Sequence, residues 1–257
     1  MVRLLAVLVL AGATAHADED NFDAPLLDQN KWGYTGSPFS DAFVKGANNI
    51  SFQSNTDTEA GYGFIYWKQK MNLSESWSAS IKVEIDLNFV TGDLAGDYGN
   101  VQASLGVVDS ITQINKTYFN TLLRENWPNN PFANQFYFNP NYEIGTGFEF
   151  EVRTPIGNSN KTLLEINHHA SLSKITSKMY AENNGDFNLV VGSHEFDTTE
   201  WGELAEVYVV VGGMSVNTIT PAGTASLDDF SIVPEPSTLS LLLASGAVLM
   251  AGRRRKS

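Results

Sequence analysis

Residues 77–89, WSASIKVEIDLNF, have the strongest periodicity in the sequence, because every odd position from Trp77 to Phe89 is apolar and every even position is polar. Successive side chains of a β-strand point to opposite faces, so this alternation predicts one long strand. Its odd-numbered face is expected to lie in the core, and its even-numbered face, which carries Glu84, Asp86 and Asn88, is expected to meet solvent.

Shorter segments repeat the strand pattern on both sides of this stretch. Residues 101–107 and 148–152 alternate in the same way, and the valine-rich run 207–211 predicts a strand that is buried on both faces and closed by Gly212 and Gly213. In residues 225–232, Ala225 and Leu227 set one phase and Phe230 and Ile232 the other. The Asp228-Asp229 pair between them therefore predicts a β-bulge.

Helix is scarce in this sequence. Only residues 116–126 have helical spacing, through Tyr118, Leu122 and Leu123, and the prolines at 128, 131 and 140 predict a loop over 126–141. Many strands with turn residues between them predict an all-β fold, a two-sheet antiparallel sandwich of the jelly-roll type. The sequence thus predicts one domain over residues 18–233.

The composition excludes several classes of function. The chain has 257 residues, 42% of them hydrophobic, no cysteine and a formal charge of −13. Without cysteine there is no disulfide, thiolate metal site or cysteine nucleophile. Nucleic acid is not an expected partner, because binding to it depends on basic residues that neutralise phosphates.

The N-terminus has the order of a secretory signal peptide. Arg3 precedes the apolar run 4–12, and an Ala-x-Ala site at 15–17 is followed by three acidic residues. We predict a signal peptide over 1–17, helical before it is removed, with cleavage between Ala17 and Asp18. A buried N-terminal helix or strand is the alternative.

The C-terminus is equally ordered. Pro234-Glu235-Pro236 leads into the apolar run 239–252, which is followed by four basic residues, Arg253, Arg254, Arg255 and Lys256. As a helix the apolar run would be about 21 Å long, short for a bilayer core of about 30 Å. The basic cluster is expected to stay on the cytoplasmic side, which leaves the domain outside.

These three C-terminal parts resemble the PEP-CTERM sorting signal of exopolysaccharide-associated bacterial proteins. The resemblance covers residues 234–257 and implies processing by an exosortase at the Pro-Glu-Pro box, after transient anchoring by a short transmembrane helix. Signal peptidase and an exosortase-like enzyme are then the processing partners, and the cell surface or extracellular polysaccharide is the destination. An ordinary tail anchor with a proline-rich linker is the alternative. Residues 18–233 hold 28 acidic and 11 basic residues, a formal charge of −17.

The domain itself resembles concanavalin-like, carbohydrate-binding jelly rolls. The resemblance rests on Asp20-Asn21-Phe22-Asp23, on the Leu-Asp-x-x-x-Trp element at 27–32, and on the closing segment 225–232. It implies the fold more strongly than the function, because one fold hosts many activities.

Glu84 and Asp86 raise the alternative of a divergent, laminarinase-like glycoside hydrolase. Those enzymes use Glu-x-Asp-x-(x)-Glu, and a retaining mechanism needs two carboxyl groups about 5 to 5.5 Å apart. Here Asn88 or Phe89 stands where the acid belongs. A solvated polar strand face is therefore favoured, and the protein is not expected to be an enzyme.

Metal and glycan sites are the remaining candidates. If the first and last strands pair, Asp20, Asp23, Asp228 and Asp229 could converge on a structural Ca²⁺; no other cofactor is expected. Aromatic and amide side chains in the 126–141 loop suit a sugar, which makes Trp127, Phe132 and Tyr137 candidate glycan contacts, with Trp32, Trp67 and Trp201 as further candidates. Core packing is the alternative for each aromatic residue. The predicted function is a non-catalytic structural or glycan-associated module.

Overall fold

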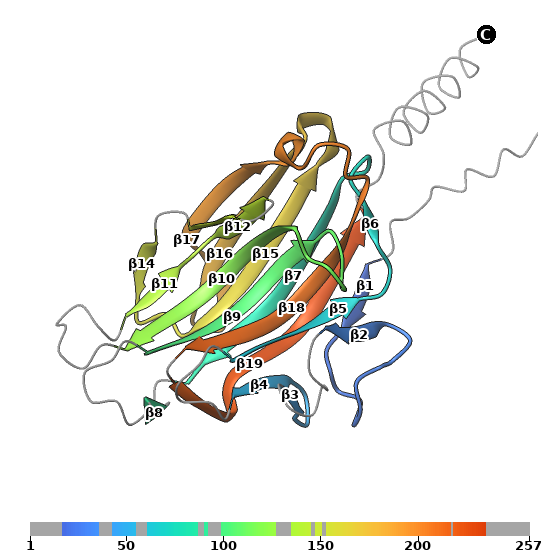
Figure 1. Ribbon diagram of the computed structural model, residues 1–257. Helices are drawn as coiled ribbons and strands as arrows, with labels where there is room; N and C mark the ends of the chain where they lie inside the picture. The colour runs from blue at the N-terminus through green and yellow to red at the C-terminus, as the bar shows by residue number, and fades with distance from the viewer. Residues whose placement is uncertain are drawn as a thin grey trace, which may run out of the picture.

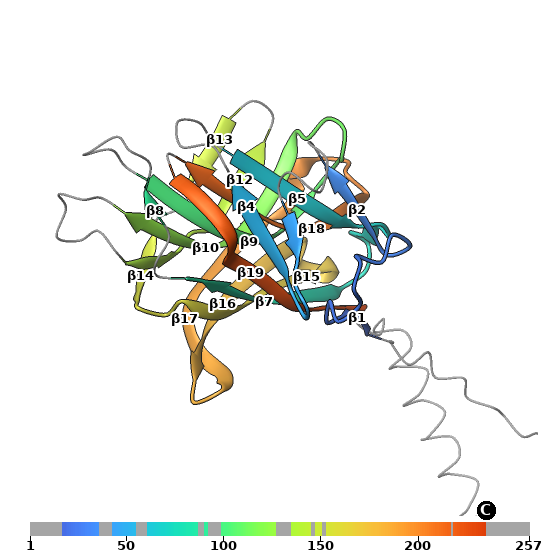
Figure 2. The same ribbon diagram turned by 90° about the horizontal axis from the view of Figure 1, so that it is seen from below.

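Two antiparallel β-sheets pack face to face in the computed structural model (Figure 1). The model describes residues 17–35, 43–54, 61–86, 90–91, 99–126, 135–144, 147–150, 153–216 and 218–234. Figure 2 shows the layers from their end, with β5 and β12 on one side and β7, β16 and β17 on the other. The predicted all-β, two-sheet sandwich is confirmed.

The strand predicted over residues 77–89 lies at the centre of the first sheet. Its main path runs β17 (Asp186–Asp197), β16 (Lys174–Asn183), β15 (Lys161–His169), β7 (Trp77–Ile85), β19 (Thr218–Pro234), β4 (Ile50–Ser54) and β3 (Phe43–Lys45). Two short strands also pair with β19, namely β1 (Asp18–Asp20) and β8 (Val90–Thr91).

The second sheet covers the apolar side of the first. Its main path runs β13 (Gly147–Phe150), β12 (Asn141–Ile144), β10 (Lys116–Asn126), β9 (Gly99–Val108), β18 (Glu206–Val216), β5 (Gly61–Trp67) and β2 (Trp32–Thr35). Three short strands lie off this path: β11 (Phe136–Phe138), β14 (Thr154–Gly157) and β6 (Met71–Asn72). Two 3₁₀ turns complete the described elements, Ala170–Leu172 and Thr198–Trp201.

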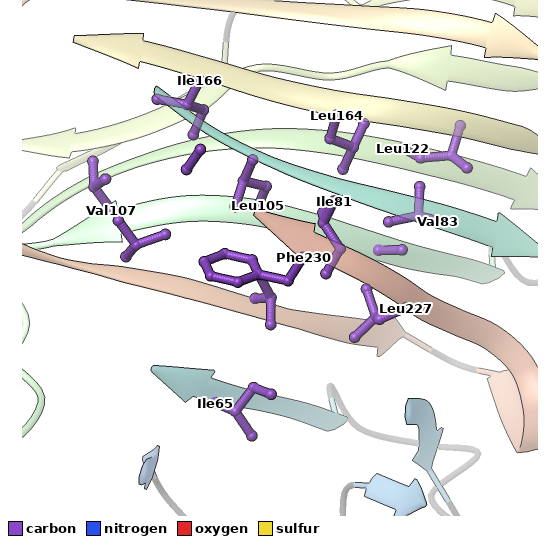
Figure 3. Close-up of a cluster of buried hydrophobic side chains, with 14 of the residues drawn as sticks. Ile65, Ile81, Val83, Leu105, Val107, Leu122, Leu164, Ile166, Leu227 and Phe230 are labelled. Atoms are coloured by element: carbon purple, nitrogen blue, oxygen red, sulfur yellow. The ribbon is translucent and has the colours of Figure 1, made fainter. Parts of the chain in front are cut away.

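The core lies between the sheets and draws on the central strands of both (Figure 3). Ile81 and Val83 of β7 lie opposite Leu105 and Val107 of β9, and each is at most 2% exposed. Burying an aliphatic side chain of this size contributes about 1.5 to 3 kcal/mol. Since the chain has no cysteine, this packing carries the fold without disulfides.

The strand predicted over residues 77–89 forms as expected over its described part. From Trp77 to Ile85, buried and half-buried residues alternate without exception, so the odd-numbered face lies in the core. The predicted extension over 87–89 lies outside the described residues. The β-bulge is also confirmed, because the register of β19 against β7 shifts between Asp228 and Ser231, and Asp229 has a positive φ of 47°.

The predicted helix over 116–126 is wrong, because this segment is strand β10 and pairs with β9 from Thr117 to Asn126. Tyr118 and Leu122 point into the core, while Phe119 and Leu123 lie on the other face and are also buried. A strand buried on both faces has apolar residues at odd and even positions, which hides the period of two. The apolar spacing that suggested a helix comes from this double burial.

Two boundaries also differ from expectation. Strand β18 continues through Gly212 and Gly213 to Val216, because these glycines are close-packing positions and not strand ends. A β-carbon at Gly213 would lie 2.6 Å from the Phe52 ring. The predicted 126–141 loop contains a short strand, since Phe136–Phe138 pairs with Leu122, Leu123 and Arg124 of β10.

The folded part begins and ends on neighbouring strands. Asp18 of β1 pairs with Ile232 of β19, so the pairing of first and last strands, on which the calcium hypothesis depends, is present. Residues 1–16 and 235–257 lie outside the described residues, and with them most of the predicted signal peptide, Glu235, Pro236, the 239–252 run and the basic tail. In the part of the chain that the structure describes, no helix has the length and apolarity needed to cross a membrane.

Candidate functional site

The outward face of the second sheet carries no basic residue over strands β5, β18, β9 and β10. Strand alternation turns one set of residues away from the core here. Two of them are acidic, Glu206 near the start of β18 and Glu125 near the end of β10. The others are uncharged: Tyr62, Phe64, Tyr66; Tyr208, Val210, Gly212, Met214, Val216; Asn100, Gln102, Ser104, Gly106, Val108; Thr117, Phe119, Thr121 and Leu123.

Three aromatic rings on this face lie across glycines of the neighbouring strand. The pairs face each other in the sheet register: Gly33 with Tyr66, Gly106 with Phe119, and Gly212 with Phe64. A β-carbon would lie 2.2 Å from the ring at Gly33 and Gly106 and 2.6 Å from it at Gly212. The missing side chains therefore leave the space in which these rings rest on the sheet.

The aromatic residues of this face are here called the aromatic platform, which consists of Tyr62, Phe64, Tyr66, Phe119 and Tyr208. The ring centres of Phe64 and Phe119 are 5.1 Å apart, and those of Tyr66 and Tyr208 are 5.4 Å apart. Phe64, Tyr66 and Tyr208 are half-buried, and Tyr62 is 65% exposed. The platform thus offers ring surface to solvent over β5 and β18.

A row of polar side chains continues the same face over β9 and β10. Ser104 and Thr121 share a hydrogen bond of 2.9 Å, and the Asn141 amide donates to the Thr121 hydroxyl at 3.4 Å. Beside them, the side chain of Asn139 is fully buried and its amide nitrogen and oxygen have no hydrogen-bond partner among the described residues. Buried polar atoms in this state are uncommon and call for a polar partner.

One cation borders the platform. The Lys70 ammonium lies 3.4 Å from the Glu206 carboxylate and 5.1 Å from the centre of the Tyr208 ring. Its charge is therefore already balanced by a carboxylate and directed toward an aromatic face.

The predicted glycan contacts have different locations. Tyr137 lies on β11 opposite Leu123, half-buried and on the outward face of the second sheet, whereas Trp127 and Phe132 lie outside the described residues. The further tryptophan candidates are core residues: Trp32 and Trp201 are 1% exposed and Trp67 is 4% exposed. Packing in the core, which was the alternative for each aromatic residue, explains these three tryptophans.

Sequence reasoning missed the aromatic platform itself. Tyr62, Phe64 and Tyr66 alternate along the sequence, which is a visible sign of an aromatic strand face. Their glycine partners, Gly33 and Gly212, are far away in the chain, so the pairing that seats the rings depends on strand register.

Glu84 and Asp86 have different surroundings. Glu84 points outward from the first sheet and its carboxylate lies 3.3 Å from the Lys161 ammonium, while Asp86 follows the end of β7 and is exposed. Glu84 instead shares a shallow hollow of about 220 Å³ with Glu182 and Asp228. Burial raises the pKa of Asp228, against the hydrogen bond that its carboxylate accepts from the Asp229 backbone, which lowers it.

The four aspartates proposed for calcium have other partners. The Asp20 carboxylate accepts hydrogen bonds from the Phe22 backbone at 2.9 Å and from the Trp32 indole at 2.8 Å. Asp229 pairs with Lys82 at 2.5 Å. Among the described residues no group of three or more acidic or histidine side chains is placed to hold a metal ion. The pairing of β1 with β19 brings these segments together without creating the expected ligand cluster.

Comparison with known proteins finds similar folds but no family for this chain. No protein-family model matches the sequence, and no curated protein matches it. Among solved structures, the CBM2 module of the evolved Dit of Lactobacillus casei BL23 phage J-1 is similar at a TM-score of 0.55 and 8% identity, over 85% of this chain and 95% of that one.

Two other solved structures also have a similar fold. Peanut lectin with a 9-residue peptide is similar at a TM-score of 0.52 and 11% identity, over 86% of this chain and 98% of that one. GH43B of the Bacteroides ovatus xyloglucan PUL is similar at 0.54 and 14% identity, over 84% of this chain but only 39% of that one. These likenesses support the predicted concanavalin-like jelly-roll fold.

Proposed function

We propose that this chain is an exported, non-catalytic protein whose sandwich domain binds glycan through the outward face of the second sheet. The observation that carries the proposal is the aromatic platform, in which Phe64 and Tyr66 rest on glycines and are half-buried, so that part of each flat ring meets solvent. Sugar rings have an apolar C–H face that stacks on aromatic rings, and such contacts need no charge.

The tyrosine hydroxyl groups of the platform support this function. Binding sites for small polar ligands combine apolar and aromatic surface with a few placed hydroxyl and amide groups. Tyr62 is exposed and Tyr66 and Tyr208 are half-buried, whereas the polar row beside Phe119 is at most 5% exposed and belongs to the packing of the sheet. Two of the structures with a similar fold, a CBM2 module and peanut lectin, agree with a glycan-binding role.

The proposed destination is the cell surface or the extracellular polysaccharide. Export by a signal peptide and sorting by the PEP-CTERM tail would remove residues 1–17 and the residues after the Pro-Glu-Pro box. The pairing of Asp18 with Ile232 and of Pro234 with Trp77 agrees with processing outside these residues. Both processing steps would leave every described strand intact.

Glycan binding is tested with the full chain against immobilised polysaccharides. Replacing Tyr66 and Tyr208 by alanine removes two half-buried rings of the platform and should weaken binding by about tenfold or more, since one stacked ring contributes about 1 kcal/mol. Phe187→Ala is the matched control, because Phe187 is a half-buried aromatic residue of the first sheet. Absence of binding to every polysaccharide would remove the proposal.

A laminarinase-like glycoside hydrolase is the second candidate, favoured by one observation. Glu84 and Asp228 line the same hollow, and the pKa of Asp228 is raised by burial while Glu84 faces a lysine. An acid and a carboxylate in different environments are what such hydrolysis requires. Hydrolysis of a glucan panel that is lost in both Glu84→Gln and Asp228→Asn would favour this candidate; an inert protein would eliminate it.

A further inference from the structure

We propose, on the basis of the proposed function, that the aromatic platform selects uncharged glycans and discriminates against polysaccharides that carry carboxylate or sulfate groups. The first argument is the charge inventory of the face. Across the outward positions of β5, β18, β9 and β10 there is no lysine, arginine or histidine. Proteins bind carboxylate and sulfate groups chiefly through such residues, above all through arginine.

The second argument is that the cation at the border of the platform is already paired. Lys70 is held between Glu206 and the Tyr208 ring, so its charge is balanced before any ligand arrives. An anionic sugar at this border would have to compete with the Glu206 carboxylate for the ammonium, and it would meet that carboxylate as a repelling neighbour.

The third argument is that four further cations of the described residues are also paired with carboxylates. Lys82 pairs with Asp229, Lys161 with Glu84, and Lys174 with Glu195, all on the first sheet. Arg153 pairs with Glu125 at the end of β10. None of these pairs leaves a cation to receive an anionic chain that lies along the platform.

The fourth argument is the field of the whole domain. Residues 18–233 carry a formal charge of −17, and such an excess repels polyanions over about one Debye length, roughly 8 to 10 Å at physiological salt. An uncharged glycan does not meet this barrier. The domain charge and the local absence of cations therefore act in the same direction.

The experiment compares matched polymers that share a backbone and differ in charge. The full chain is titrated onto immobilised hydroxyethylcellulose and carboxymethylcellulose, curdlan and carboxymethylcurdlan, and dextran and dextran sulfate, at low and at moderate salt. We expect binding to a neutral member and binding about tenfold or more weaker to its anionic partner at low salt, with a smaller difference as salt is added.

A charge variant tests the role of the bordering pair. Glu206→Gln releases Lys70 and should strengthen binding to the anionic polymer by about threefold, the scale of an exposed ion pair. Binding to the neutral polymer should not change. The double variant Glu206→Gln with Lys70→Met is the control, and the gain should disappear in it.

The outcomes separate the two proposals. Equal or tighter binding to the anionic members would overturn the selectivity and leave glycan binding in place. No binding to any of the six polymers would count against glycan binding itself, and the selectivity would fall with it. Neutral binding that survives loss of Tyr66 and Tyr208 would show that the platform is not the contact surface.

Discussion

Gly33 and Tyr66 face each other across β2 and β5, and the tyrosine ring fills the space that a side chain on Gly33 would need. A β-carbon there would lie 2.2 Å from the tyrosine ring carbon Cζ and 2.4 Å from the hydroxyl oxygen. The absence of one methyl group thus determines where a half-buried ring of the aromatic platform lies. Sheet stability and the proposed glycan contact depend on the same pair.

Gly33→Ala should displace the Tyr66 ring and lower the free energy of unfolding by about 1 to 3 kcal/mol, as overpacking does. Urea denaturation measures the change. In a Tyr66→Ala background the same substitution should cost much less, because the three nearest atoms to the added carbon all belong to the Tyr66 side chain. Equal costs in the two backgrounds would show that the ring does not rest on Gly33.

Asn120 joins the two sheets through its amide. Its nitrogen donates to the Glu165 carbonyl at 3.0 Å and to the Lys178 carbonyl at 2.7 Å, so a strand of the second sheet contacts β15 and β16 of the first. Asn120→Ala removes both bonds from a fully buried position and should lower the free energy of unfolding by about 2 to 4 kcal/mol.

The control for Asn120 is Asn188→Ala, a change at an exposed position of β17. It should alter the free energy of unfolding by about 0.5 kcal/mol or less. Thermal or urea unfolding of the two variants side by side gives the comparison. A loss for Asn120→Ala no larger than for the control would mean that the amide does not connect the sheets.

His168 should make the fold sensitive to mild acid. The imidazole is fully buried, its Nδ1–H donates to the Glu75 carbonyl at 2.9 Å, and its ring stacks on Trp77. Burial lowers the pKa of His168 below its ordinary value of 6.5, against the hydrogen bond to Glu75, which raises it. The neutral form is therefore the one that the folded protein accommodates.

The direction of the pH effect on stability follows from proton uptake by the folded and the unfolded protein. As pH falls through 6.5, the unfolded chain protonates at this residue before the folded protein does, so stability decreases until the lower, folded-state pKa is reached. Urea midpoints measured between pH 8 and pH 5 should fall in wild type. They should fall less in His168→Gln, and His169→Gln, with a half-buried side chain, should behave like wild type.

The sequence could predict those strands that have one face in the core and the other toward solvent. In β7 the solvent side is polar from Ser78 to Glu84, so the period of two is visible. In β10 both faces are buried, and the same period disappears. The candidate site could not be predicted from the sequence. Strand register decides which aromatic rings lie on Gly33, Gly106 and Gly212, and the sequence does not give that register.

The predicted processing sites can be tested on the protein recovered from producing cells. Asp18 pairs with Ile232, and Pro234 is the last residue of β19, so trimming further inward at either end would break a strand pair. Intact-mass spectrometry should therefore find an N-terminus at or near Asp18 and a C-terminus at the Pro-Glu-Pro box. A mature protein that retains Arg253 to Lys256 would contradict sorting by an exosortase, and retention of residues 1–17 would contradict the signal peptide.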